Sequence, residues 1–235
     1  MKKTSNLEKL TCVDLFCGCG GMSLGFQKAG FEVKAGFELW DPAMRVYAAN
    51  FKHPVLKQDL SKVGEAVKKI KAYSPDLIVG GPPCQDFSTA GHQDESRGRA
   101  ILSIYYSQIV SAVRPMYFVM ENVANIRKSK AFPEVLANFK KAGYGVTQRV
   151  LDAAFCGVPQ TRKRMFVIGA HGEKDDFLGD VLDGALAKKP MSIYDYLGDS
   201  LGTKYYFRNP SLYCLRLLPL IHQTIYPHLL SPLLC

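Results

Sequence analysis

The sequence lacks the long apolar segments and the cysteine spacings that mark several common protein classes. Its 235 residues contain no run of about 18 apolar residues, so no membrane-spanning helix is predicted. The charged start MKKTSNLEKL is followed by no apolar stretch of the signal-peptide kind. The seven cysteines form no disulfide-like or metal-binding pattern, which favours a reducing, cytoplasmic setting and no metal site.

Acidic residues are few relative to basic ones, with 21 Asp and Glu against 30 Lys and Arg and a formal net charge of +9. That balance suits an acidic partner such as nucleic acid, although a merely basic soluble protein fits the charge equally well. A chain of this length can bury a substantial core, and one domain with an appendage is expected.

A strand, a glycine-rich turn and a helix are predicted near the N-terminus. TCVDLF (11–16) is typical of a buried strand, CGCGG (17–21) follows it directly, and the next helix is expected to end at Gly30. In open α/β sheets such a unit holds nucleotide-like cofactors, because glycines let the backbone approach the ligand and the helix start offers free N–H groups. The spacing departs from the full G-x-G-x-x-G, so an ordinary turn is the alternative.

Three further residues lie where such a cofactor would be held. Glu38 ends a second predicted strand, about 20 residues after the glycines, and is placed to bind two ribose hydroxyls. A solvated loop carboxylate is the alternative. Trp40, the single tryptophan, is placed to stack on an adenine, and Asp59 to accept from its amino group, although a turn or cap role also fits Asp59.

Two helix starts are also predicted. Asp41 and Pro42 suit an N-cap and first helical residue, and Ser61 suits the cap of a Lys-rich helix that runs to about Ala72. The lysines of that helix are expected to form a solvated face rather than a binding patch.

Cys84 stands in GGPPCQDFS (80–88), directly after two glycines and two prolines. The preceding DLIV (76–79) has strand character, and the prolines fix φ, so the thiol is expected on a stiff loop at a strand end. A nucleophile needs that positioning, whereas a buried structural cysteine is the alternative. A polar surface loop with Arg97 and Arg99 is predicted to follow.

Glu121 follows MYFVM (116–120), a continuous apolar run typical of a central strand. Since active sites of open α/β sheets lie at the carboxyl ends of strands, Glu121 and Cys84 are expected in one crevice. Apolar surroundings raise the pKa of a carboxyl, so Glu121 is expected to hold its proton and donate it. Arg162 and Arg164 alternate with Lys163 and are expected on one strand face, binding phosphate or holding a base, or else forming a basic hairpin arm.

In chain order, five groups of residues resemble the DNA cytosine-5 methyltransferase family over about residues 11–170. They are DLFCGCGG (14–21), Glu38 with Asp59, GPPCQ (81–85) with Ser88, ENV (121–123) and QTRKR (160–164). The resemblance implies an α/β, Rossmann-like S-adenosylmethionine-dependent methyltransferase fold, with a mixed, mostly parallel sheet and helices on both faces. The implied substrate is a specific sequence of double-stranded DNA, as in restriction–modification enzymes.

The resemblance also implies roles for individual residues. Cys84 would attack carbon 6 of a flipped-out cytosine, Glu121 would hold or protonate N3, and Arg162 and Arg164 would support Glu121 and the base. Residues implied in cofactor binding are Phe16, Gly18, Gly20, Gly21, Glu38, Trp40, Asp59 and Pro82. Residues implied in DNA binding are Ser88, Arg97 and Arg99.

The C-terminal part departs from the family. Residues 1–172 are predicted to form the catalytic domain, 173–210 a connector and 211–235 an atypical tail rich in Leu. The family's target-recognition domain is largely missing, so either a second polypeptide supplies it or the product is truncated or frameshifted. Methylation of tRNA and a non-catalytic remnant that binds cofactor or DNA are the alternative functions.

Overall fold

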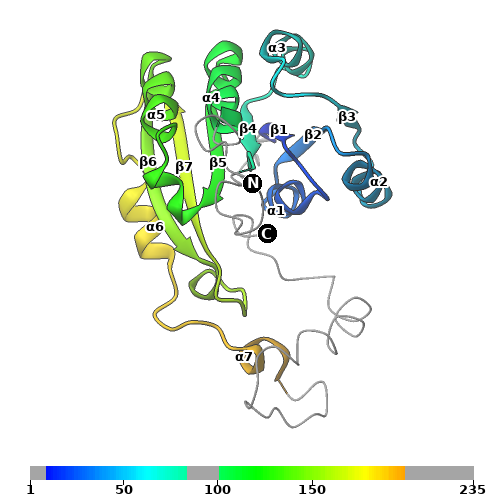
Figure 1. The fold of residues 1–235 in the computed structure, drawn as a ribbon. Coiled ribbons are helices and arrows are strands. Elements are labelled where there is room, and N and C mark those ends of the chain that lie inside the picture. The colour runs from blue at the N-terminus through cyan, green and yellow to red at the C-terminus, as the bar shows by residue number, and fades with distance from the viewer. Residues whose placement is uncertain (1–8, 84–100, 199–235) are drawn as a thin grey trace, which may run out of the picture.

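The computed structural model describes residues 9–83 and 101–198, which form a seven-stranded sheet in the order β3-β2-β1-β4-β5-β7-β6 (Figure 1). Every strand pair among β1 to β5 is parallel, and β7 runs antiparallel to both β5 and β6. The predicted mixed, mostly parallel sheet is therefore confirmed. The strands are β1 (Thr11–Leu15), β2 (Glu32–Glu38), β3 (Val55–Lys57), β4 (Leu77–Gly80), β5 (Tyr117–Val123), β6 (Tyr144–Asp152) and β7 (Lys163–His171).

Helices cover both faces of the sheet, because side chains on successive strand residues point to opposite faces. On β4, Ile78 packs with one core cluster, which includes residues of α3, α4 and α5, whereas Val79 packs with a second cluster that includes α1 and the segment around α6. The helices are α1 (Gly21–Lys28), α2 (Asp41–Asn50), α3 (Val63–Lys71), α4 (Ile101–Val113), α5 (Phe132–Lys141), α6 (Gly179–Ala185) and α7 (Ile193–Leu197), with 3-10 helices η1 (Ala124–Lys128) and η2 (Ala153–Phe155).

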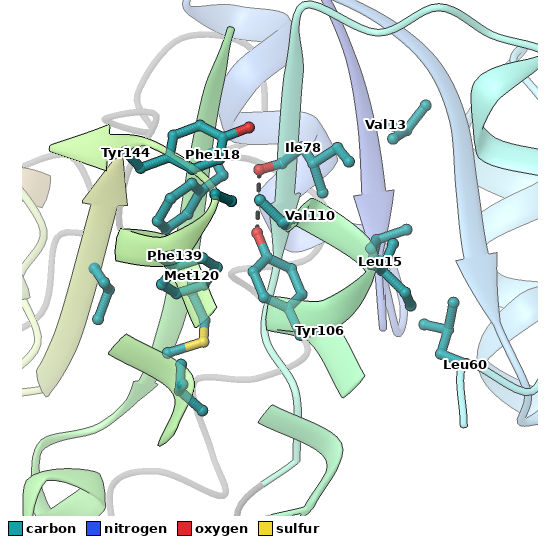
Figure 2. Packing of buried hydrophobic residues seen from close by; sticks show 14 of the residues in the cluster. Val13, Leu15, Leu60, Ile78, Tyr106, Val110, Phe118, Met120, Phe139 and Tyr144 are labelled. Atoms are coloured by element: carbon teal, nitrogen blue, oxygen red, sulfur yellow. Dashed lines mark hydrogen bonds between the residues drawn. The ribbon is translucent and has the colours of Figure 1, made fainter. Parts of the chain in front are cut away.

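Tyr106 of α4 joins β4 to β5 from within the core. Its hydroxyl lies 2.9 Å from the carbonyl oxygen of Val119 and 3.1 Å from that of Ile78, the contact drawn as a dashed line in Figure 2. A Cβ on Gly80 would lie 2.8 Å from Tyr106 Cε2, so only a glycine leaves room for the ring. This packing fixes the end of β4, directly before the loop that leads toward Cys84.

Two predicted helix starts are each wrong by one residue. Ser61 does not cap α3; its amide and hydroxyl both donate to Asp59 Oδ1, and Lys62 is the N-cap without a side-chain bond. The third strand ends at Lys57, before the Asp59 turn. Asp41 is already the first residue of α2, so it does not cap the helix either.

The expected connector is partly helical. α6 packs beside β6, where Arg149 forms ion pairs with Asp176 and Asp183, and the Leu178 amide donates to Thr147 Oγ1. The division of the chain at residues 172 and 210 stays a prediction.

Candidate active site

The candidate site lies at the carboxyl edge of the sheet, where the strand order reverses at β1. The last residue of β1, Leu15, pairs with Phe37 of β2 on one side and with Gly80 of β4 on the other. The turn after β1 and the loop after β4 therefore start side by side, which is the position where open α/β sheets bind ligands.

The glycine turn after β1 is compact. Phe16, Gly18 and Gly20 all have positive φ, and the Gly20 amide donates to the Cys17 carbonyl oxygen at 2.9 Å. A Cβ on Gly20 would lie 2.2 Å from Phe51 Cε2, whereas a Cβ on Gly18 would have no atom of residues 9–83 and 101–198 within 4 Å. Packing therefore requires glycine at position 20, while the described residues leave the space beside Gly18 open. Gly21, the last glycine of the motif, begins α1.

Glu38 is held against this turn although 20 residues separate it from Gly18 in the sequence. Its Oε2 accepts from the Gly18 amide at 2.9 Å, and its Oε1 accepts from the amides of Leu39 and Trp40. Each carboxylate oxygen can accept more than one hydrogen bond, so capacity remains for a ligand. Trp40 is 65% exposed, so its ring is accessible to a ligand bound beside Glu38.

Asp59 has the turn role that the sequence left open. Hydrogen bonds from the hydroxyl and amide of Ser61 lower the pKa of Asp59 below its ordinary value. Its contact with an adenine stays a prediction.

A buried polar chain beneath the glycine turn was missed from the sequence. The Ser23 hydroxyl donates to Asp14 Oδ2 at 2.7 Å, Tyr47 Oη lies 2.7 Å from Ser23 Oγ, and His53 Nε2 lies 2.8 Å from Tyr47 Oη. Among the described residues Asp14 Oδ1 has no hydrogen-bond partner, and burial raises the pKa of Asp14 to about 7. The sequence contained one signal of this polar chain, which was the acidic residue Asp14 inside an apolar strand. The other members of the polar chain come from α1, α2 and the loop after α2.

We expect Asp14 to make folding stability depend on pH. Its raised pKa stabilises the folded protein fully below the unfolded value near 3.8, and that contribution is lost as pH rises through about 7. Asp14→Asn keeps an oxygen for Ser23 but cannot ionise. Between about pH 4.5 and about pH 8, the free energy of unfolding of the wild type should therefore fall by a few kcal/mol more than that of the variant. Urea unfolding at both pH values measures this difference, and equal pH dependence of the two proteins would contradict it.

Glu121 lies on β5 just beyond the residues that pair with β4. Arg164, opposite Val123 on β7, places Nε 3.0 Å from Glu121 Oε1, and the two side chains are 24% and 20% exposed. Burial raises the pKa of Glu121, while the charges of Arg164 and Arg162 oppose that rise. The pKa of Glu121 is therefore raised, as predicted, and the charges of both arginines partly offset the rise. Arg162 precedes β7, so it does not share a strand face with Arg164 as predicted.

The loop after β4 lies against Glu121. A Cβ on Gly81 would lie 3.2 Å from Glu121 Oε2, and Asn122 Nδ2 donates to the buried Pro82 carbonyl oxygen at 2.9 Å. The ENV motif thus fixes both the carboxyl and the entry to the Cys84 loop. The predicted site residues Cys84, Ser88, Arg97 and Arg99 lie outside the described residues.

Within residues 9–83 and 101–198, no three His, Cys, Asp or Glu side chains gather in a way that could hold a metal ion. No helix in the same ranges has the length and apolarity needed to cross a membrane.

Comparison with protein families identifies the family of the chain. The model of the C-5 cytosine-specific DNA methylases matches residues 10–215. The chain belongs to this family. The chain is 52% identical over 204 residues to the Type II methyltransferase M.HindV of Haemophilus influenzae, covering 87% of the chain and 67% of the relative. It is 50% identical over 202 residues to the Type II methyltransferase M.HgiDI of Herpetosiphon aurantiacus, covering 86% and 65%.

Solved structures confirm the methyltransferase fold. A prophage-encoded E. coli protein described as a DNA modification methyltransferase gives a TM-score of 0.66 at 29% identity, over 81% of this chain and 55% of the other. The S. pombe Dnmt2 methyltransferase gives 0.63 at 22% identity, over 75% and 56%, and shows the shared fold alone. The chain spans about two thirds of the length of these two curated relatives and little more than half of these two structures.

Proposed function

We propose that this protein transfers a methyl group from S-adenosylmethionine to carbon 5 of a flipped-out cytosine in a specific double-stranded DNA sequence, as part of a restriction–modification system. The observation that best supports this is the Glu121–Arg164 pair, 3.0 Å apart and half-buried, beside the Gly81–Pro82 loop that leads toward Cys84. Burial raises the pKa of the Glu121 carboxyl, which favours the protonated form that can donate to a ring nitrogen.

The residues around the glycine turn fit the cofactor. The open space beside Gly18 admits a ligand close to the backbone, and Glu38 presents a carboxylate with remaining acceptor capacity for ribose hydroxyls. Bound there, S-adenosylmethionine supplies the methyl group that carbon 5 accepts. The residues that would hold it are Phe16, Gly18, Gly20, Gly21, Glu38, Trp40, Asp59 and Pro82.

The glycine turn gives a test of the cofactor site with an internal control. Gly20→Ala meets Phe51 in a left-handed conformation and should cost about 2–4 kcal/mol of folding stability, against about 1–2 kcal/mol for Gly18→Ala. Gly18→Ala should nevertheless weaken S-adenosylmethionine binding at least about tenfold, because its methyl group enters the open space. Calorimetric titration and urea unfolding measure both quantities; unchanged cofactor affinity in Gly18→Ala would contradict this site.

Catalysis follows from what the side chains do to the cytosine ring. The Cys84 thiolate forms a bond to carbon 6, while Glu121 protonates or holds N3 and so stabilises the charge that the attack places in the ring. Arg164 and Arg162 orient Glu121 and the base. After methylation, the proton leaves carbon 5 and the bond between Cys84 and carbon 6 breaks, which frees the enzyme.

The loop after Cys84 supplies DNA contacts in this proposal. Ser88, Arg97 and Arg99 would contact phosphates around the flipped nucleotide, whose extrusion costs a few kcal/mol. We include a second polypeptide that supplies the target-recognition domain, since the chain spans about two thirds of two Type II methyltransferases.

Methyl transfer from labelled S-adenosylmethionine to duplex DNA and to tRNA tests the proposal, with and without a candidate partner chain. We expect transfer to duplex DNA and a covalent adduct with DNA that contains 5-fluorocytosine. Transfer to tRNA alone would reject the DNA substrate. Absence of any adduct, even with the partner chain, would favour a non-catalytic protein that only binds cofactor or DNA.

A further inference from the structure

Exposed basic side chains lie directly beyond the Glu121 motif, on η1 and the residues around it. Ile126 is almost fully buried and anchors η1, while Arg127, Lys128 and Lys130 are all exposed. Lys163, also exposed, begins β7, the strand that η1 contacts. We call these four residues, Arg127, Lys128, Lys130 and Lys163, the η1 surface.

No acidic side chain neutralises the η1 surface within the part of the chain that the structure describes. The ion pairs of the described residues involve other cations, such as Lys57 with Asp41 and Lys140 with Asp175. Glu121 pairs with Arg164, and Asp152 accepts from the amides of Ala154 and Arg162; neither carboxylate forms an ion pair with the η1 surface. The surface therefore presents exposed cations that form no ion pair within residues 9–83 and 101–198.

The position of the η1 surface distinguishes it from the other Lys-rich segment. η1 follows the carboxyl end of β5, and Lys163 opposes Asp152 at the end of β6, so the cations lie at the same sheet edge as Glu121. Lys68 and Lys69 are equally exposed, but they stand in the last turn of α3, which leads into the amino end of β4. Connectivity thus places this second pair at the opposite edge.

We propose that the η1 surface binds backbone phosphates of duplex DNA next to the target base. The inference rests on the proposed function, since a duplex whose cytosine reaches Glu121 must bring its phosphates to this edge. Lys and Arg that neutralise phosphates release condensed counterions, so the affinity falls steeply with salt in proportion to the number of contacts. Such contacts hold the duplex in register and carry no sequence information.

The test compares two double variants with the same loss of charge, Arg127→Gln/Lys128→Gln and Lys68→Gln/Lys69→Gln, each in the full chain. The probe is a labelled duplex of about 25 base pairs. Fluorescence anisotropy gives its affinity for each protein between about 50 and 200 mM salt. The η1 variant should reduce the slope of log K against log salt by about 1–2 and weaken binding about 5- to 50-fold at about 100 mM salt. The α3 variant should match the wild type. Thermal unfolding and S-adenosylmethionine affinity should be unchanged in both.

Equal slopes for the two variants would overturn the proposal, as would a wild-type affinity that does not depend on salt. The binding measurement needs no methyl transfer, so it separates this inference from the proposed function. A slope difference without a 5-fluorocytosine adduct would support the η1 surface and reject the catalytic role. An adduct with equal slopes would do the reverse.

Discussion

Replacing Cys84 with alanine is expected to abolish methyl transfer while cofactor binding stays measurable. Without the thiolate no bond to carbon 6 forms, and carbon 5 of cytosine is then too weak a nucleophile to accept the methyl group. Loss of a covalent nucleophile should lower the rate by at least about 10⁴-fold. The glycine turn and Glu38 are untouched by the substitution, so calorimetric titration should give a near-normal affinity for S-adenosylmethionine.

Cys156 offers a matched control for this experiment. It is a half-buried free cysteine at the end of η2, and burial raises the pKa of its thiol, which disfavours the reactive thiolate. Cys156→Ala should retain methyl transfer and the 5-fluorocytosine adduct, and Cys84→Ala should lack both. Residual methylation or adduct formation by Cys84→Ala would refute its assignment as the nucleophile.

The second large effect is expected for Glu121→Gln, which should lower the transfer rate by about 10²- to 10⁴-fold. Glutamine has the same shape and can still accept from Arg164 Nε, so the ion-pair geometry of 3.0 Å is preserved as a hydrogen bond. It cannot give up a proton to N3. Single-turnover transfer with saturating cofactor measures the change, and a near-normal rate would exclude proton donation by Glu121.

The pH dependence tests the same residue through its raised pKa. If the protonated carboxyl is the active form, wild-type kcat/KM should fall as pH rises through the pKa of Glu121, and burial shifts that fall to higher pH. Arg164→Met removes the opposing positive charge, so its fall should move further upward in pH. Glu121→Gln should lack this alkaline limb altogether; the same limb in the glutamine variant would assign it to another group.

Much of the fold could be predicted because its signals are local. The apolar run TCVDLF, the glycines after it and the acid at the end of β2 follow one another within 30 residues, and the structure places them as the spacing predicted. The failures were also local. Ser61 was assigned to the helix cap, but Asp59 two residues earlier offered its hydroxyl a carboxylate, and a competing hydrogen bond of that kind cannot be weighed from residue types alone.

The sequence by itself determined the family, the strands that end at the candidate site, and the chemical identity of the side chains at the carboxyl edge, since these depend on short-range patterns. Only the tertiary structure decided that Asp14 shares a buried polar chain with Tyr47 and His53, and that Arg164 rather than Arg162 pairs with Glu121. The same holds for the contrast between Gly18 and Gly20. In each case the partners come from different elements, so their distance is set by packing, which no spacing along the chain encodes.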